Sequence, residues 1–212
     1  MKRSFYGILG ILFLIVCLSQ AAPEPVVVSE SGRWTIDTEF THPQQIIMQG
    51  KSGNQLMRFW YVIITLTNKT DLDVNFYPKC ELMTDTFQII PESKSIESKV
   101  FEQIRKRHRS KYPFLKPLHA ADNKILQGEN NAIDLAIIWP DFDKKAQNIK
   151  IFITGLSNET AVINHPVAKD QEGIPLKVFL RKTLELSYNL KGDPASVSGS
   201  NLQFEGKRWI MK

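Results

Sequence analysis

The segment Arg58–Thr67 constrains the fold of this chain more than any other stretch of its sequence. Apolar side chains fill both of its alternate sets, which are Trp60, Val62, Ile64 and Leu66 in one and Phe59, Tyr61 and Ile63 in the other. Successive side chains of a β-strand point to opposite faces of the sheet, so both faces of this strand need cover. The segment ends at the turn sequence 68–71. We therefore expect a central strand.

Other segments rich in β-branched and aromatic residues are spread along the chain and bounded by turn residues. Val74–Thr84 is expected to follow the central strand as its hairpin partner, with Phe87–Ile90 as an extension. Trp34–Phe40 and Gln45–Met48 are expected to form an edge pair. The remaining predicted strands are Ala132–Trp139, Ile149–Leu156, Val178–Tyr188 and Arg208–Met211.

This pattern of about seven to nine short strands with short connections predicts an all-β fold. The expected architecture is an antiparallel immunoglobulin-like β-sandwich with one amphipathic helix inserted near residues 94–110. No linker rich in Pro, Gly or Ser divides the interior, and Gly192–Asn201 is interpreted as a flexible loop. We expect residues 33–212 to form a single domain, after a signal peptide at 1–21 and a short leader at 22–32.

The expected helix carries apolar residues on one face and a basic run near its end. Ile96, Val100, Phe101, Ile104 and His108 recur at spacings near 3.6, and Ser93 or Ser95 would be the N-cap. The basic run 105–111 lies on the opposite face. One interpretation is a solvated face that complements the C-terminal carbonyls of the helix. The other is a docking patch for an anionic envelope polymer or a lipid head group, with Arg105, Arg107 and Arg109 as binding residues.

The N-terminus has the three parts of a secretory signal peptide. Lys2 and Arg3 are basic, Ile8–Leu18 is apolar, and the small-residue pattern Ser19–Ala21 suits cleavage after Ala21 or the next alanine. The chain is therefore expected to be exported to the periplasm or the extracellular space.

Two alternatives would tether the protein to a membrane instead. An uncleaved anchor would need about 20 apolar residues, and the run Phe5–Leu18 is shorter. Lipidation at Cys17 would use the leucine three residues earlier, but Val16 stands where a lipobox normally has Gly or Ala. We expect a membrane contact only in one of these two cases.

Cleavage would leave Cys80 as the single cysteine of the mature chain, which excludes an internal disulfide. Cys80 alternates with Val74, Phe76 and Leu82, so we expect a buried thiol. Loss of Lys2 and Arg3 with the signal peptide leaves 25 basic against 22 acidic residues. This balance is ordinary and does not predict a nucleic-acid partner.

A search for local catalytic and metal motifs finds none. The chain has no G-x-S-x-G, H-E-x-x-H, phosphate-binding glycine loop or C-x-x-C, and no two of its four histidines have metal-ligand spacing. We therefore assign no catalytic residue, no metal ligand and no cofactor.

The most chemically suggestive segment is Trp139–Asp143. Its carboxylates, Asp141 and Asp143, could ligate Ca²⁺ or bind sugar hydroxyls, with Trp139 or Phe142 as a stacking platform. The alternative is that Trp139 fills the edge of the core and the aspartates cap a turn.

Several blocks of the sequence resemble an uncharacterised group of exported bacterial proteins. These blocks are Phe59–Thr70, Phe76–Pro78, Leu82–Thr86, Gly128–Asn131, Gly155–Thr160 and Leu180–Leu184. More loosely, the chain is similar to immunoglobulin-like sandwiches of secreted bacterial proteins of unknown function. The resemblance implies an exported β-rich fold and supplies no catalytic or binding residues.

Two functional hypotheses follow. The first is a non-catalytic exported β-sandwich module of the cell envelope that binds a protein, a glycan or an anionic polymer. The second is a hydrolase whose site is assembled from the scattered residues His108, His119, Asp141 and Asp143, and it requires at least two of them to meet in one pocket.

Overall fold

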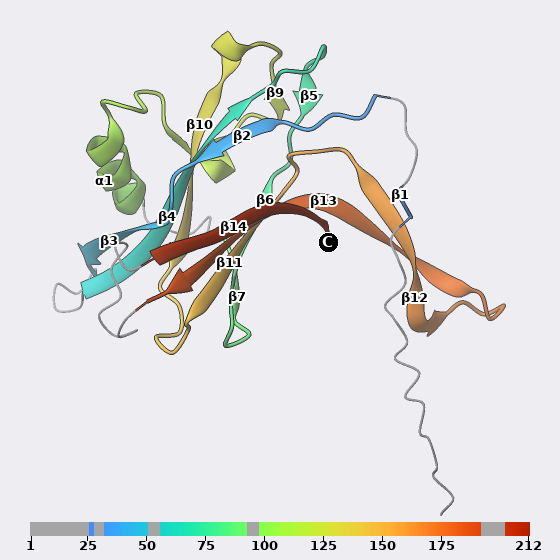
Figure 1. The fold of residues 1–212 in the computed structure, drawn as a ribbon. Helices are drawn as coiled ribbons and strands as arrows, with labels where there is room; N and C mark the ends of the chain where they lie inside the picture. Colours follow the sequence, from blue (N-terminus) through green and yellow to red (C-terminus); the bar gives the residue numbers. More distant parts are fainter. Residues whose placement is uncertain (1–25, 28–31, 51–55, 93–97, 192–201) are drawn as a thin grey trace, which may run out of the picture.

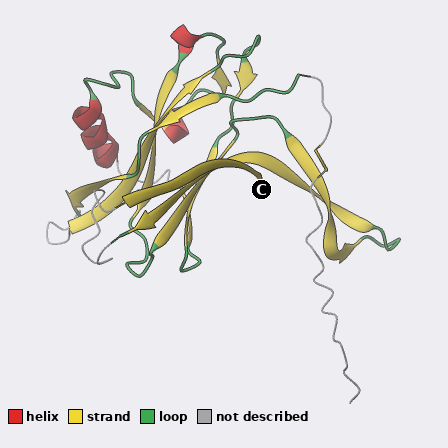
Figure 2. Ribbon diagram, in the orientation of Figure 1, coloured by secondary structure: helices red, strands yellow, loops and turns green. Residues whose placement is uncertain are grey.

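The computed structural model describes residues 26–27, 32–50, 56–92, 98–191 and 202–212 of the 212-residue chain (Figure 1). Strands dominate this part of the chain, as the sequence predicted (Figure 2). The predicted signal peptide with Cys17, most of the leader and the loop Gly192–Asn201 lie outside the described residues.

The order of elements alternates strands with few helical segments. It reads β1 (Val26–Val27), β2 (Asp37–Phe40), β3 (Gln44–Gln49), β4 (Leu56–Thr67), β5 (Val74–Asn75), β6 (Lys79–Thr84), β7 (Ile89–Pro91), α1 (Ser98–His108), β8 (Lys116–Pro117), η1 (Leu118–Ala120), β9 (Lys124–Ile125), η2 (Glu129–Asn131), β10 (Ile133–Pro140), β11 (Asn148–Thr154), β12 (Thr160–Lys169), β13 (Pro175–Leu190) and β14 (Leu202–Met211).

Two sheets hold most of these strands. The seven-stranded sheet runs β1-β12-β13-β11-β6-β7, with β14 also paired to β13. The five-stranded sheet runs β2-β4-β10-β8, with β3 also paired to β4. Pairing is antiparallel except between β8 and β10. Buried side chains from both sheets share one core cluster, which includes Trp60, Val62, Ile64, Leu135, Ile137, Leu82, Ile151, Ile153, Leu184 and Leu186.

The prediction of a central strand at Arg58–Thr67 is confirmed. β4 has β2 and β3 along one edge and β10 along the other. Its second apolar face, with Tyr61 and Ile63, is covered by α1 through Val100 and Ile104. Full burial of an aliphatic side chain of this size stabilises a fold by about 1.5–3 kcal/mol, so these contacts hold the helix against the sheet.

The predicted hairpin between the central strand and Val74–Thr84 is wrong. This segment is divided between β5, which pairs with β9, and β6, which pairs with β11 and β7 in the other sheet. The turn after β4 does not reverse the chain tightly, because the Asn68 amide is buried and donates to the carbonyl oxygens of Leu72 and Ile125. The chain is thereby led across to the opposite sheet.

The two segments predicted as an edge pair do lie at an edge of the sheet, but they pair with β4 and not with each other. β2 and β3 lie end to end along the same edge of β4. Between them, the backbone N–H of Thr41 donates to Ile63 O, and the Ile63 N–H donates to Thr41 Oγ1. The chain therefore continues along β4 and does not fold back on itself.

Other strands also differ from the sequence prediction. Phe87–Ile90 is not an extension, because β7 returns antiparallel to β6 after a turn in which Phe87 has a φ of 62°. β12 was not predicted. β13 and β14 begin earlier than expected, at Pro175 and Leu202.

The helix and the cysteine agree with the sequence analysis. α1 falls within the predicted range 94–110, although residues 93–97, with the proposed N-caps and Ile96, lie outside the described residues. Cys80 is free and 2% exposed, and burial raises the pKa of its thiol, so it is an unreactive core residue.

Candidate functional site

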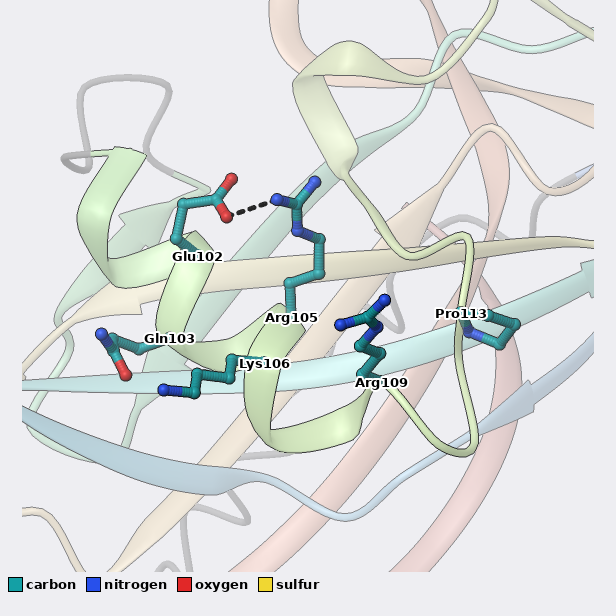
Figure 3. Close-up of a pocket in the computed structure, with 6 residues that line it drawn as sticks. All are labelled: Glu102, Gln103, Arg105, Lys106, Arg109 and Pro113. Atoms are coloured by element: carbon teal, nitrogen blue, oxygen red, sulfur yellow. Dashed lines mark hydrogen bonds and ion pairs between the residues drawn. The ribbon is translucent and has the colours of Figure 1, made fainter.

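The exposed side of α1 borders a cationic hollow. Val100 and Ile104 face the sheet, whereas Arg105, Lys106 and Arg109 are exposed. The hollow has a volume of about 600 Å³. Its lining residues are Glu102, Gln103, Arg105, Lys106, Arg109 and Pro113 (Figure 3). Three cations and one carboxylate therefore share it. We call Arg105, Lys106 and Arg109 the basic surface.

The three cations of the basic surface differ in their partners. Arg105 Nη2 lies 2.5 Å from Glu102 Oε2, and both side chains are about half exposed. An exposed pair of this kind contributes about 0–1 kcal/mol and is easily exchanged for another anion. Within the described ranges, Lys106 and Arg109 form no ion pair, so no described side chain neutralises these two positive charges at the hollow.

Arg107, the third predicted binding residue, has a different role. Its Nη1 donates to the Gln45 carbonyl oxygen at 3.0 Å and to Tyr61 Oη at 3.3 Å. These contacts join α1 to β3 and β4. The structure therefore separates Arg107, which anchors the helix, from Arg105 and Arg109, which line the hollow.

His108 completes the same anchor. The Tyr61 hydroxyl donates to Gln44 Oε1 at 2.9 Å and lies 2.9 Å from His108 Nε2. Since the hydroxyl has only one hydrogen, His108 donates to it through Nε2–H. Burial lowers the pKa of His108, with Arg107 and Lys111 adding to the effect, so the ring is neutral at pH 7.

The segment Trp139–Asp143 is used by the fold. Trp139 is fully buried, so its ring cannot be a stacking platform for a sugar. Asp141 Oδ1 accepts hydrogen bonds from Arg58 Nε at 2.9 Å and Trp60 Nε1 at 3.1 Å. Phe142 stacks on Trp60 with ring centroids 5.0 Å apart.

Asp143 likewise has a local structural role. Its Oδ1 accepts from the Lys145 N–H, and its own N–H donates to Gln88 Oε1. This arrangement matches the turn-cap interpretation. No group of three or more His, Cys, Asp and Glu side chains in the described ranges is placed to hold a metal ion.

The four residues of the hydrolase hypothesis do not assemble into one site. His108 contacts Tyr61 and Asp141 contacts Trp60, and these neighbours on β4 point to opposite faces of the sheet. His119 instead lies 3.5 Å from Glu92.

A second hollow was not predicted from the sequence. It has a volume of about 410 Å³ and lies on the five-stranded sheet beyond the end of α1, and its lining residues are Glu39, Phe40, Thr41, His42, Thr65, Lys111, Tyr112 and Asp134. Its central polar row, Glu39, Thr65 and Asp134, comes from three strands paired side by side. Residues so far apart in sequence carry no common signal before the pairing is known.

Comparison with protein-family models, curated proteins and solved structures finds no match to this chain. Among the described residues, no helix has the length and apolar character needed to cross a membrane.

Proposed function

We propose that the mature protein is a non-catalytic, exported β-sandwich module of the cell envelope, with an immunoglobulin-like arrangement, that binds an anionic polymer through the basic surface of α1. The observation that carries this proposal is the hollow at which Lys106 and Arg109 have no ion-pair partner among the described residues. Export rests on the signal-peptide pattern of the sequence.

The chemistry of the hollow favours a polyanion over a neutral glycan. Three cations against one carboxylate give a local excess of positive charge, which raises the local concentration of anions. Arginine forks suit the paired oxygens of phosphate or sulfate groups. Arg105 and Arg109 are one helical turn apart, so a chain of repeated anionic groups can contact both.

The binding test uses immobilised dextran sulfate, with unsulfated dextran as the neutral reference. The double variant Lys106→Glu/Arg109→Glu should weaken binding by about ten-fold or more, equivalent to about 1.4 kcal/mol. The matched control, Lys144→Glu/Lys145→Glu, changes net charge equally at exposed positions away from α1. It should change binding by less than about two-fold at physiological salt, because exposed charges are screened beyond about 8 Å. Equal losses in both variants would reject a specific surface.

The export part of the proposal has a separate test. The intact mass of the protein from its native host distinguishes cleavage near Ala21, lipid on Cys17 and retention of the whole apolar segment. A mass that includes residues 1–21 would contradict export by a cleaved signal peptide.

A further inference from the structure

Part of the seven-stranded sheet extends beyond the two packed sheets as a narrow arm (Figure 1). We define the arm as Thr160–Lys169 of β12, the turn 170–174 and Pro175–Arg181 of β13. β12 and β13 pair antiparallel along it, and β1 pairs with β12 only at Val162 and Ala161. A two-stranded ribbon is marginally stable by itself in water.

One edge of β13 is paired in the body of the protein, whereas no described strand covers it in the arm, where we call it the open edge. From Lys182 to Leu190, β14 pairs with this edge. The pairing ends where Arg181 and Lys212 exchange backbone hydrogen bonds of 2.8 and 3.1 Å. Before Arg181, no strand of the described chain covers the same edge.

The open edge presents the backbone groups of Lys177 and Phe179. Alternate residues of a strand direct their N–H and C=O groups to the same edge. Arg181 directs its groups toward β14, whereas the Lys182 N–H donates to Glu159 O on the side of β12. Lys177 and Phe179 share the orientation of Arg181, so four backbone groups are available to an added strand.

The side chains of β13 beside this edge differ between the two faces of the strand. Lys177, Phe179 and Arg181 share one face, and both cations are exposed, as is 68% of Phe179. Leu176, Val178 and Leu180 share the other face, and Leu176 is 45% exposed. One face of the edge is therefore cationic and the other apolar.

These charges disfavour pairing between two copies of the arm. Antiparallel pairing about a two-fold axis at Lys177 would place this lysine opposite itself, and an axis at Phe179 would place Lys177 opposite Arg181. An axis at Val178 would bring the second strand against Lys212, which already occupies that edge. These three registers of a second copy are therefore disfavoured.

We propose that the open edge of β13 binds an extended segment of another protein, with alternating acidic and apolar residues, as an added β-strand in line with β14. Its backbone pairs with Lys177 and Phe179. Its acidic side chains lie opposite Lys177 and Phe179. The second of them is diagonal to Arg181, whose own edge position is occupied by Lys212. Its apolar side chains extend the face formed by Leu176 and Val178. This surface is separate from the basic surface of α1.

The probe is an end-blocked peptide, Thr-Glu-Val-Glu-Val-Glu-Thr, labelled for fluorescence anisotropy and titrated with the full-length protein. We expect saturable binding, and about ten-fold weaker binding for Lys177→Glu. A peptide with lysine in place of glutamate should not bind. The Lys106→Glu/Arg109→Glu variant should bind the probe like the unaltered protein, which separates this proposal from polymer binding at α1.

The backbone contribution has its own variants. Phe179→Pro removes the N–H that points to the open edge and should abolish probe binding, whereas Phe179→Val keeps this N–H and should retain binding. If Phe179→Pro fails to fold, hydrogen exchange of the unaltered protein tests whether the probe binds the backbone of the open edge. Amide exchange at Lys177 and Phe179 should slow when the probe is added. Exchange at Val178 and Leu180, whose amides face β12, should not change.

Three results would overturn the proposal. The first is probe binding that does not respond to Lys177→Glu. The second is unchanged exchange at Lys177 and Phe179 with saturating probe. The third is a dimer of the protein alone, seen by sedimentation, that Phe179→Pro dissociates, because a second copy would then occupy the edge.

Discussion

The two halves of β13 carry the same alternation of apolar residues in different surroundings. In the body of the protein, Leu184 and Leu186 are fully buried between the sheets, whereas Leu176 in the arm is 45% exposed on the same face of the strand. Alternation therefore predicts a strand in both halves. It does not tell which half is covered, because cover comes from a second sheet that packs only on the body.

The largest difference between the halves should be seen on truncation of a leucine. Leu186→Ala should destabilise the protein by about 2–5 kcal/mol, because it leaves a cavity in the shared core. Leu176→Ala in the arm should cost less than about 1 kcal/mol, since solvent already reaches that side chain. Urea denaturation of both variants gives the comparison. Similar costs would mean that the arm is covered by another part of the protein in solution.

The second comparison concerns two glycines, Gly155 in the segment before β12 and Gly173 in the turn after it. Gly155 lies between β11 and the arm with φ +92°, and a Cβ there would lie 2.6 Å from the carbonyl oxygen of Tyr77. Gly173, at the tip of the arm, has φ +82° and no atom within 4 Å of such a Cβ. Gly155→Ala should therefore cost more than about 2 kcal/mol and Gly173→Ala about 1 kcal/mol, because only the first adds a clash to the backbone strain. Thermal unfolding of the pair measures the difference, and equal shifts would show that the close approach to Tyr77 relaxes at no cost.

The third comparison uses two carboxylates, one in each region. Glu185 is 3% exposed in the body and accepts hydrogen bonds from Arg208 Nε and Nη2 at 3.0 and 3.1 Å. Burial by itself would raise the pKa of Glu185, but Arg208 and Lys150 outweigh it, so the pKa lies below its ordinary value. A depressed carboxylate pKa stabilises the fold above the unfolded-state pKa of about 4.3. This contribution is lost as the pH falls through the folded-state pKa.

Glu185→Gln should therefore lower the free energy of unfolding at pH 7 by about 1–2 kcal/mol. It should also make the loss of this free energy between pH 5 and pH 2 smaller than in the unaltered protein. Glu172→Gln, at the exposed tip of the arm, is the matched control and should leave both quantities within about 0.5 kcal/mol of the unaltered protein. Chemical denaturation at several pH values gives both. A Glu185→Gln profile parallel to that of the unaltered protein would show that Arg208 does not hold this charge.

The contrast between a strand's local residue pattern and the contacts made by distant residues also explains which parts of the fold could be predicted from sequence. Both faces of β4 are apolar, so its central position is readable from local residues. The hairpin was mispredicted because the partner of β6 depends on where the buried Asn68 amide directs the chain. That depends on hydrogen bonds to residues distant in sequence, which local patterns do not contain.

The candidate site residues could likewise be predicted only as far as local sequence patterns reach. Helical spacing correctly placed Arg105, Lys106 and Arg109 away from the buried face of the helix. It could not separate Arg107 from Arg109, because the difference lies in Gln45 and Tyr61 on neighbouring strands. Trp139 had two interpretations from sequence, a stacking platform and a residue that fills the edge of the core, and its complete burial agrees with the second.

The smallest effect is expected at Phe179, the most exposed aromatic residue of the arm. Phe179→Thr should change the free energy of unfolding by less than about 0.5 kcal/mol, because threonine suits a strand and little buried area is lost. The same substitution at the buried Phe152 of β11, which pairs with the body half of β13, should cost about 2–4 kcal/mol. If Phe179→Thr proves as costly as Phe152→Thr, the ring is packed against a partner in solution, and the arm is not an open edge in the isolated protein.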